Sequence, residues 1–247
     1  MNSLEGANPS SAEGPRRPDG GSQTLSRGLR LLEVLAEART PLSIDELAGV
    51  LGLHRSIVYR LLRTLEEHGI AVRDGSGRVT LGPRLAALAA SVSHDLQASA
   101  LPELTAVADE LAMTCFVAVL DRAECVTLVT VEPRHAIVSV AQRPGTRHAT
   151  SVGAPGKAIL VQLPPEEWPG ETDAELAAAV RGAIERGWAE SHDEVIPGLR
   201  SIAVPLALRQ QPAAALAVVY VASVHAPAEI GERLRLAAAR VRAAHDG

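Results

Sequence analysis

The segment LGLHRSIVYRLLRTLEEHG, residues 51–69, predicts a helix over 54–68 that has two different faces. Apolar side chains recur at the spacing of one helical stripe, at Val58, Leu61, Leu62 and Leu65. The opposite side carries no acid and presents Ser56, Tyr59, Arg60 and Arg63. Arginine forks suit guanine edges and phosphates, and hydroxyls donate to phosphate oxygens. Taken alone, the pattern favours an amphipathic helix with a solvated basic face, so the neighbouring segments decide.

Two predicted helices precede this segment. Residues 24–38 have the apolar stripe Leu25, Leu29, Leu32 and Leu35, and Thr40-Pro41 ends them. Ser43 is a predicted N-cap, and Glu46 is its capping-box partner. The short helix that follows is expected to have an inward face made of Ile44, Leu47, Ala48 and Leu51. A tight turn at Gly52-Leu53 joins it to the polar-faced helix, which is the helix-turn-helix arrangement.

A glycine-rich hairpin comes next. Residues 70–73 and 78–81 are predicted strands, and the loop between them is Asp-Gly-Ser-Gly. Arg73 and Arg78 flank that loop, as expected of a wing that lies along a phosphate backbone or in a minor groove. Three helices followed by a basic hairpin predict a winged helix-turn-helix DNA-binding domain over residues 23–82.

The composition limits the class of protein. A net charge of −5 restricts any nucleic-acid binding to one face, because proteins that coat nucleic acid are far more basic. No apolar run is long enough to span a bilayer and no signal peptide is visible, so we expect a cytoplasmic protein without a membrane partner. Residues 1–22 are rich in Gly and Pro and are expected to be a disordered tail. Cys115 and Cys125 are expected to be small core side chains.

Another helix is predicted over residues 83–99, beginning at Pro83. Its apolar stripe is Leu85, Leu88, Val92 and Leu96. This stripe fits either a helix of the core or a linker helix that pairs with its counterpart in a second subunit.

Residues 100–247 predict an α+β domain. Pro102 begins a helix with an inward face of Leu104, Val107, Ala108 and Leu111. Strands are predicted at 115–120, 125–131, 136–142, 201–208 and 213–222. Further helices are predicted from near Ala154, over 172–186 and from Pro227. Consecutive hairpins with helices between them favour an antiparallel sheet flanked by helices.

Five blocks of the chain resemble the IclR family of bacterial transcriptional regulators, in the order that the family has them. They are LSRGLRLLEVL at 25–35, the segment 51–69, RVTLGPRL at 78–85, the block 145–158 with its GAPGKA, and the block 194–205. The resemblance implies a winged helix-turn-helix, a linker helix and a GAF-like effector domain. It also implies three kinds of partner: double-stranded DNA, a small-molecule effector, and further copies of the chain in a dimer or a dimer of dimers.

The resemblance further implies the effector-binding positions Gly153, Ala154, Gly156, Ser201, Val218 and Tyr220. Family members usually have Pro-Leu-His where this chain has Ala149, Thr150 and Ser151. Some members that bind small oxoacids use hydroxyls on the second late strand, where this chain has Val218 and Tyr220, so the effector expected here is an acid with an apolar body. From the residues alone, Gly153 to Gly156 form either a carboxylate site at a helix start or a tight loop that serves packing.

Two charged residues near the implied pocket receive structural interpretations. Lys157 is the only lysine and could pair with an anion, although the surface is the commoner place for a lysine. Glu194 is interpreted as a hydrogen-bond acceptor in a loop rather than as a general base.

We therefore expect a ligand-responsive regulator that binds a pseudo-palindromic operator. The expected DNA contacts are Arg55, Ser56, Tyr59, Arg60 and Arg63, with Arg73 and Arg78 on the backbone. No metal, cofactor or catalytic residue is expected, because no two histidines have ligand spacing on one helix and neighbours such as Ser191-His192-Asp193 point apart. Two alternatives stay open: an effector-blind DNA-binding oligomer, and a small-molecule enzyme with an appended helix-turn-helix.

Overall fold

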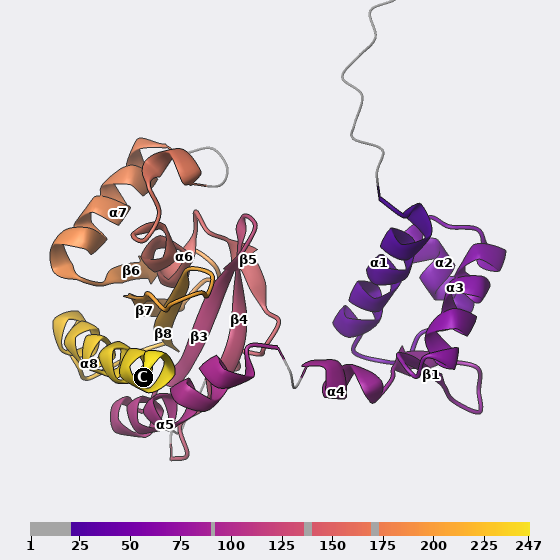
Figure 1. Cartoon of the computed structure of the whole chain (residues 1–247), viewed down its shortest axis with the longest axis horizontal. Coiled ribbons are helices and arrows are strands. Elements are labelled where there is room, and N and C mark those ends of the chain that lie inside the picture. The colour runs from indigo at the N-terminus through magenta and orange to yellow at the C-terminus, as the bar shows by residue number, and fades with distance from the viewer. Residues whose placement is uncertain (1–20, 90–91, 136–139, 169–172) are drawn as a thin grey trace, which may run out of the picture. The chain divides into compact units, whose positions relative to one another are not determined.

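The computed structural model describes residues 21–89, 92–135, 140–168 and 173–247, which form two compact units (Figure 1). The units meet in the sequence at Val92 and Ser93. Nearly all of the tail predicted at 1–22 lies outside the described residues. In the part of the chain that is described, no helix is both long and apolar enough to cross a membrane.

The first unit contains three helices and a hairpin: α1 (Gln23–Glu37), α2 (Ile44–Leu51), α3 (Arg55–Glu67), β1 (Ala71–Arg73) and β2 (Val79–Leu81). The predicted capping box begins α2, because the Glu46 N–H donates to Ser43 Oγ at 3.3 Å and the Ser43 N–H donates to Glu46 Oε2 at 2.7 Å. Gly52 ends α2 in the left-handed conformation, with φ +63°. The apolar face of α3 packs with Leu31 and Leu47 in one core. The predicted helix-turn-helix is confirmed.

The inward face of α1 differs from the prediction. Leu35 is buried as expected, but Leu25 and Leu29 are 63% and 52% exposed. The buried positions are Gly28, Leu31 and Leu35. In a segment as rich in leucine as this one, two adjacent stripes both fit the helical period, and tertiary packing selects between them.

The helix predicted over 83–99 is wrong in its boundaries. The structure has α4 (Arg84–Ala89) and α5 (His94–Leu111), and residues 90–91 between them lie outside the described part. Pro102 lies inside α5, where the sequence predicted the beginning of a new helix. Proline removes one backbone hydrogen bond, but the buried face that includes Leu104 holds the helix together across it. Leu96, expected in a subunit-pairing stripe, is buried in the core of the second unit.

The second unit is an antiparallel sheet between two helical layers, which confirms the α+β prediction. The described strands run in the order β5-β4-β3-β8-β7-β6. Their bounds are β3 Thr114–Asp121, β4 Glu124–Val131, β5 Arg147–Ala149, β6 Ala189–His192, β7 Arg200–Leu206 and β8 Ala214–Tyr220. Helices α5 and α8 (Pro227–Asp246) cover one face of the sheet (Figure 1). Helix α6 (Gly153–Leu160) covers the other face, α7 (Ala174–Arg186) packs on α6, and a 3-10 turn, Pro165–Glu167, lies between these two helices in the sequence.

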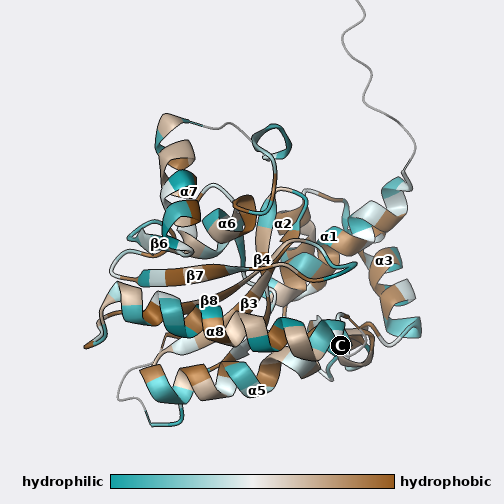
Figure 2. Cartoon of the chain, turned by 60° about the vertical axis from the view of Figure 1, so that its left-hand side comes forward, coloured by the Kyte–Doolittle hydropathy of each residue, from teal (hydrophilic) through white to brown (hydrophobic). Residues whose placement is uncertain are grey.

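The central strand β8 is buried on both faces. Leu216, Val218 and Tyr220 pack in the core beneath α5 and α8, whereas Ala217 and Val219 pack on the side of α6. A strand covered on both sides becomes a continuous apolar run, and Figure 2 shows β8 mostly in the hydrophobic colour. The alternation of this strand decides which of its residues can reach a cavity beside α6.

Three strand predictions differ from the structure. The strand predicted at 136–142 lies mostly outside the described residues, and Val140–Gln142 are irregular. Strands β5 and β6 were not predicted. Both are short, polar edge strands, and such strands lack the apolar alternation by which a strand is recognised in a sequence.

Candidate functional site

Helix α3 presents the predicted polar face to solvent. His54 caps the helix, since its Nδ1 accepts from the Ser56 N–H at 3.3 Å. Val58, Leu61 and Leu62 are buried beneath, which fixes the rotation of the helix. All five predicted contact residues of this helix are exposed: Arg55, Ser56, Tyr59, Arg60 and Arg63. Long polar side chains on an exposed helix can reach base edges in a major groove.

Acids lie closer to this face than the sequence analysis expected. Arg55 pairs with Asp45 of α2 at 3.0 Å, and Arg63 pairs with Glu67 one turn further on at 3.1 Å. Glu67 follows Arg63 by four residues, so it shares the stripe that was interpreted as free of acid. Arg60 has no acid partner among the described residues. Exposed ion pairs contribute about 0–1 kcal/mol each, so a phosphate can replace these acids at small cost.

The wing arginines are both engaged within the first unit. Arg73 pairs with Glu66 at 2.9 Å, and its guanidinium lies 5.9 Å from the centre of the Tyr59 ring. Arg78 donates to the Pro41 carbonyl at 2.8 Å and to Glu46 at 3.3 Å, which ties the wing to the beginning of α2. Backbone contacts by these arginines therefore require that they share or leave their present partners.

The wing loop is shaped by a single carboxylate. Asp74 Oδ1 accepts from the N–H groups of Ser76 and Arg78 at 2.9 and 3.0 Å, and from the Ser76 hydroxyl at 2.7 Å. The hydrogen bond from the Ser76 hydroxyl is the main reason why the pKa of Asp74 lies below its usual value. The loop conformation is thus fixed without the help of DNA.

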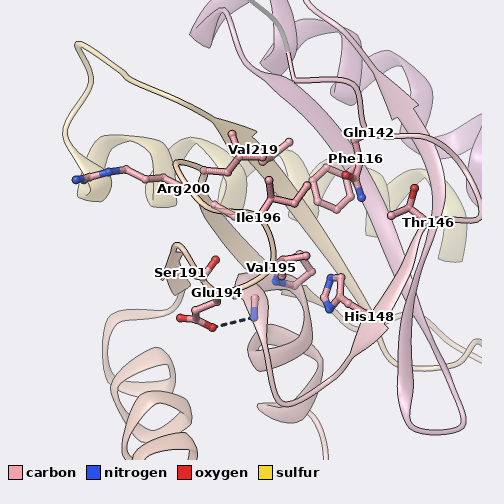
Figure 3. Close-up of a pocket in the computed structure, with 14 residues that line it drawn as sticks. Phe116, Gln142, Thr146, His148, Ser191, Glu194, Val195, Ile196, Arg200 and Val219 are labelled. Atoms are coloured by element: carbon pink, nitrogen blue, oxygen red, sulfur yellow. Dashed lines mark hydrogen bonds between the residues drawn. The ribbon is translucent and has the colours of Figure 1, made fainter.

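The second unit has a cavity between the beginning of α6 and strands β3, β7 and β8. Its volume is about 60 Å³. Phe116 and Val219 come from the sheet, and Val195 and Ile196 come from the loop after β6 (Figure 3). The remaining lining residues are Gln142, Thr146, His148, Gly153, Pro155, Ser191, Glu194, Leu199, Arg200 and Ser201. The cavity therefore combines an apolar body with a polar edge.

Only part of the predicted effector set lines this cavity. Gly153 and Ser201 do, and the Ser201 hydroxyl donates to the Val218 carbonyl at 2.7 Å. Ala154 and Gly156 are buried within α6 and do not line it; the lining residue between them is Pro155. A Cβ on Gly156 would overlap the backbone of Thr150, so this glycine serves close packing.

Val218 and Tyr220, also in the predicted set, do not line this cavity. Both side chains belong to the core beneath α5 and α8, and burial raises the pKa of the Tyr220 hydroxyl. The β8 residue that lines the cavity is Val219. Because side chains alternate along a strand, an assignment shifted by one residue points to the opposite face.

Glu194 lies at the beginning of α6. One of its carboxylate oxygens accepts from the Gly153 N–H at 2.9 Å, drawn as a dashed line in Figure 3, and the other pairs with Lys157 at 2.5 Å. Lys157 also donates to the Glu190 carbonyl at 3.3 Å and is buried, contrary to the surface position expected for it. The interpretation of Glu194 as an acceptor in a loop agrees with these contacts.

Ser191 stands apart from its two neighbours of catalytic type, whereas His192 Nε2 lies 3.4 Å from Asp193 Oδ2. Ser191 lines the apolar cavity, whereas His192 lines an open cleft on the other side of Glu194, so the two side chains diverge. Cys115 and Cys125 are both buried and free. Burial raises the pKa of the Cys115 thiol far above its usual range and that of Cys125 to about 12, so both are protonated at neutral pH.

Two family models match the chain: the IclR helix-turn-helix domain at residues 24–75, and the bacterial transcriptional regulator IclR C-terminal domain at residues 88–243. The chain belongs to the IclR family. It is 33% identical over 177 residues to the HTH-type transcriptional regulator Rv1719 of Mycobacterium tuberculosis. The aligned region covers 70% of this chain and 67% of that protein.

Solved structures of IclR proteins share the fold. The regulator from Alicyclobacillus acidocaldarius has a TM-score of 0.80 and 26% identity, and the alignment covers 92% of this chain and all of that one. An IclR homologue from Microbacterium hydrocarbonoxydans, solved in complex with 4-hydroxybenzoate, has a TM-score of 0.78 and 24% identity over 90% of this chain and 98% of that one.

As an IclR protein, the chain is a DNA-binding transcriptional regulator. Sequence reasoning missed several residues that line its cavity, among them Phe116, His148, Ser191 and Val219. Phe116 offered a signal, since it is the only phenylalanine in the chain and lies in a predicted strand. His148 and Ser191 offered none, because they belong to short edge strands.

Proposed function

We propose that this regulator reads its operator with α3 and that an organic acid with an apolar body, bound in the cavity beside α6, changes its affinity for DNA. The observation that carries the proposal is that the chain has both an exposed, arginine-bearing helix in one unit and a partly apolar cavity in the other. Because the relatives in this family are transcriptional regulators, we propose a regulatory rather than an enzymatic role for the cavity.

The proposed base contacts come from the face that carries Ser56, Tyr59, Arg60 and Arg63, with Arg55 at the helix N-terminus. Arg60 is the strongest candidate for a bidentate contact to guanine, since no acid among the described residues competes for its guanidinium. Arg73 and Arg78 are proposed to lie over the phosphate backbone, where contacts set orientation rather than sequence preference.

The lining of the cavity supports the class of effector. Phe116, Val219 and Ile196 suit an aromatic or branched body, and His148 and Ser191 supply polar groups at its edge. The Microbacterium relative was solved with 4-hydroxybenzoate, an acid of this kind. An apolar cavity that holds benzene has a volume of about 150 Å³, so a space of about 60 Å³ has to widen before such an acid enters.

We propose that the protein acts in the cytoplasm as a homodimer or a dimer of dimers on a pseudo-palindromic operator, because a two-fold axis in the protein matches one in the DNA. Leu88 and Val92 of the predicted pairing stripe are each 54% exposed, and we place them in this contact.

The test is footprinting on the DNA upstream of the protein's own gene, with and without 4-hydroxybenzoate, benzoate and 3-methylbutanoate. We expect two protected half-sites one helical turn or a multiple apart, and a change in protection when an acid is added. Protection that no acid alters would favour the effector-blind oligomer. Turnover of an added acid would favour the enzyme with an appended helix-turn-helix.

A further inference from the structure

Glu194 occupies the position that an organic acid needs. Its carboxylate holds both the Gly153 N–H, at 2.9 Å, and the ammonium group of Lys157, at 2.5 Å. These are the contacts by which a helix N-terminus and a buried cation bind a free carboxylate. The protein thus binds its own carboxylate at the edge of its own cavity.

The described residues that line the cavity provide no second strong site for an anion. Apart from Glu194, the charged residue of the lining is Arg200, whose exposed guanidinium points away from the cavity in Figure 3. His148 also lines the cavity, and its Nδ1 lies 3.0 Å from the Ala149 carbonyl oxygen. A carboxylate that entered beside an ionised Glu194 would meet a like charge.

Glu194 also separates two spaces. It lines the apolar cavity on one side and an open cleft on the other, and that cleft includes Lys157, Asp173 and His192. The volume of the cleft is about 460 Å³. A Glu194 side chain that leaves Gly153 therefore has room in the cleft, and its departure removes one wall of the cavity.

The loop that carries Glu194 is closed at its base. The Asp193 N–H donates to the Leu199 carbonyl at 3.0 Å, and Asp193 Oδ1 accepts from the Gly198 N–H at 2.5 Å. Asp193 and Gly198 have φ of +62° and +83°. Between them, Val195 and Ile196 line the cavity and are still 46% and 49% exposed. The segment can therefore move as one piece, and its apolar side chains would gain cover from a ligand.

We propose that Glu194 is a built-in competitor of the effector: an organic acid binds by taking over the Gly153 N–H and Lys157 from the Glu194 carboxylate, and the displaced loop 193–199 widens the cavity. This inference rests on the proposed function, because it takes the cavity as the effector site. The exchange transfers no proton and makes or breaks no covalent bond, because one carboxylate only replaces another in the same contacts.

The experiment is calorimetry on the full chain with 4-hydroxybenzoate and with its neutral isostere 4-hydroxybenzamide. In Glu194→Gln the competing charge is gone and Lys157 has lost its counter-ion, so we expect 4-hydroxybenzoate to bind about tenfold more tightly than in the wild type. The affinity for the amide should change by less than about twofold. Glu175→Gln removes an exposed acid from the same cleft and should bind both compounds as the wild type does.

A second variant covers the case in which Glu194→Gln does not fold with an unpaired lysine. Lys157→Gln combined with Glu194→Gln removes both charges but keeps the Gly153 N–H, so exchange predicts that this variant prefers the acid to the amide less strongly than Glu194→Gln does. Unchanged or weaker acid binding in Glu194→Gln, or a preference for the acid in the double variant as strong as in Glu194→Gln, would overturn the exchange alone. If neither the wild type nor any of these variants binds 4-hydroxybenzoate, benzoate or 3-methylbutanoate, the acid-effector proposal is wrong and the exchange is wrong with it.

Discussion

Val218 and Val219 are neighbours on β8, yet Val218 lies in the core beneath α5 and α8 while Val219 lines the cavity on the opposite face of the sheet. The two positions therefore provide a matched pair of variants. One tests the cavity, and the other tests the core on which the cavity rests.

Val219→Phe should fill much of the cavity and abolish detectable binding of 4-hydroxybenzoate, because the added ring occupies the space that an effector needs. Val218→Ala should keep that binding and lower the free energy of unfolding by about 2 kcal/mol, since it deletes two buried methyl groups. Calorimetry and urea denaturation measure the two effects. Binding that survives Val219→Phe at wild-type affinity would move the effector site elsewhere.

The same pair of residues marks the limit of prediction from the sequence. Alternation correctly implies that Val218 and Tyr220 share one face. It does not tell which face meets the cavity, because all seven residues of β8 are buried and no polar position orients the strand. The distinction depends on which helices cover each side, and that is a property of the whole domain.

Local patterns were predicted better. The Ser43 and Glu46 capping box and the buried face of α3 each depend on residues within one or two helical turns, and both are confirmed. Contacts between distant segments gave no signal. Arg78 and Glu46 are 32 residues apart, and the pair of Lys157 and Glu194 joins a helix to a loop 37 residues later.

Arg60 and Arg63 differ in what surrounds them, so they should respond differently to substitution. Arg60→Ala should weaken operator binding by about 1–3 kcal/mol if it removes a bidentate base contact. Arg63→Ala should cost less, because its guanidinium must first leave Glu67. Glu67→Gln is the matched control and should strengthen binding, most of all at low salt. Fluorescence anisotropy on the footprinted DNA gives the affinities, and wild-type values for both alanine variants would reject α3 as the reading helix.

Acid should destabilise the first unit through Glu46. Its hydrogen bonds with Ser43, followed by the charge of Arg78, hold the pKa of this carboxyl below its usual 4.5. A lowered pKa in the folded state means that the stabilising contribution is complete above pH 4.5 and is lost as pH falls through the lower folded value. The urea midpoint of this unit should therefore fall less steeply with acid in Glu46→Gln than in the wild type. Equal slopes for both proteins would contradict this assignment.

Assembly should depend on the apolar residues of α4. Leu88 is 54% exposed, and Leu88→Glu would place a charge in the proposed contact between subunits, which is costly to bury. Sedimentation should give a dimer or tetramer for the wild type and a smaller species for the variant. Leu236→Glu changes a residue on α8 that is 58% exposed and serves as the control for an added surface charge. A wild-type monomer at micromolar concentration that still binds one half-site tightly would rule out the two-fold model.

Gly153 and Gly156 should respond to alanine in different ways, although sequence analysis assigned both to the effector site. At Gly153, with φ +80°, a Cβ would lie 3.0 Å from a methyl of Val195 and 3.2 Å from the His148 ring, so Gly153→Ala strains the backbone by about 1–2 kcal/mol and forces these two cavity-lining side chains to shift. We expect 4-hydroxybenzoate binding to weaken while the first unit unfolds as in the wild type.

At Gly156 the Cβ meets the Thr150 backbone, which cannot yield as a flexible side chain does, so Gly156→Ala should mainly destabilise the second unit, by about 3 kcal/mol. Calorimetry and urea unfolding distinguish the two, and a Gly153→Ala protein that binds the acid like the wild type would place the carboxylate away from the beginning of α6.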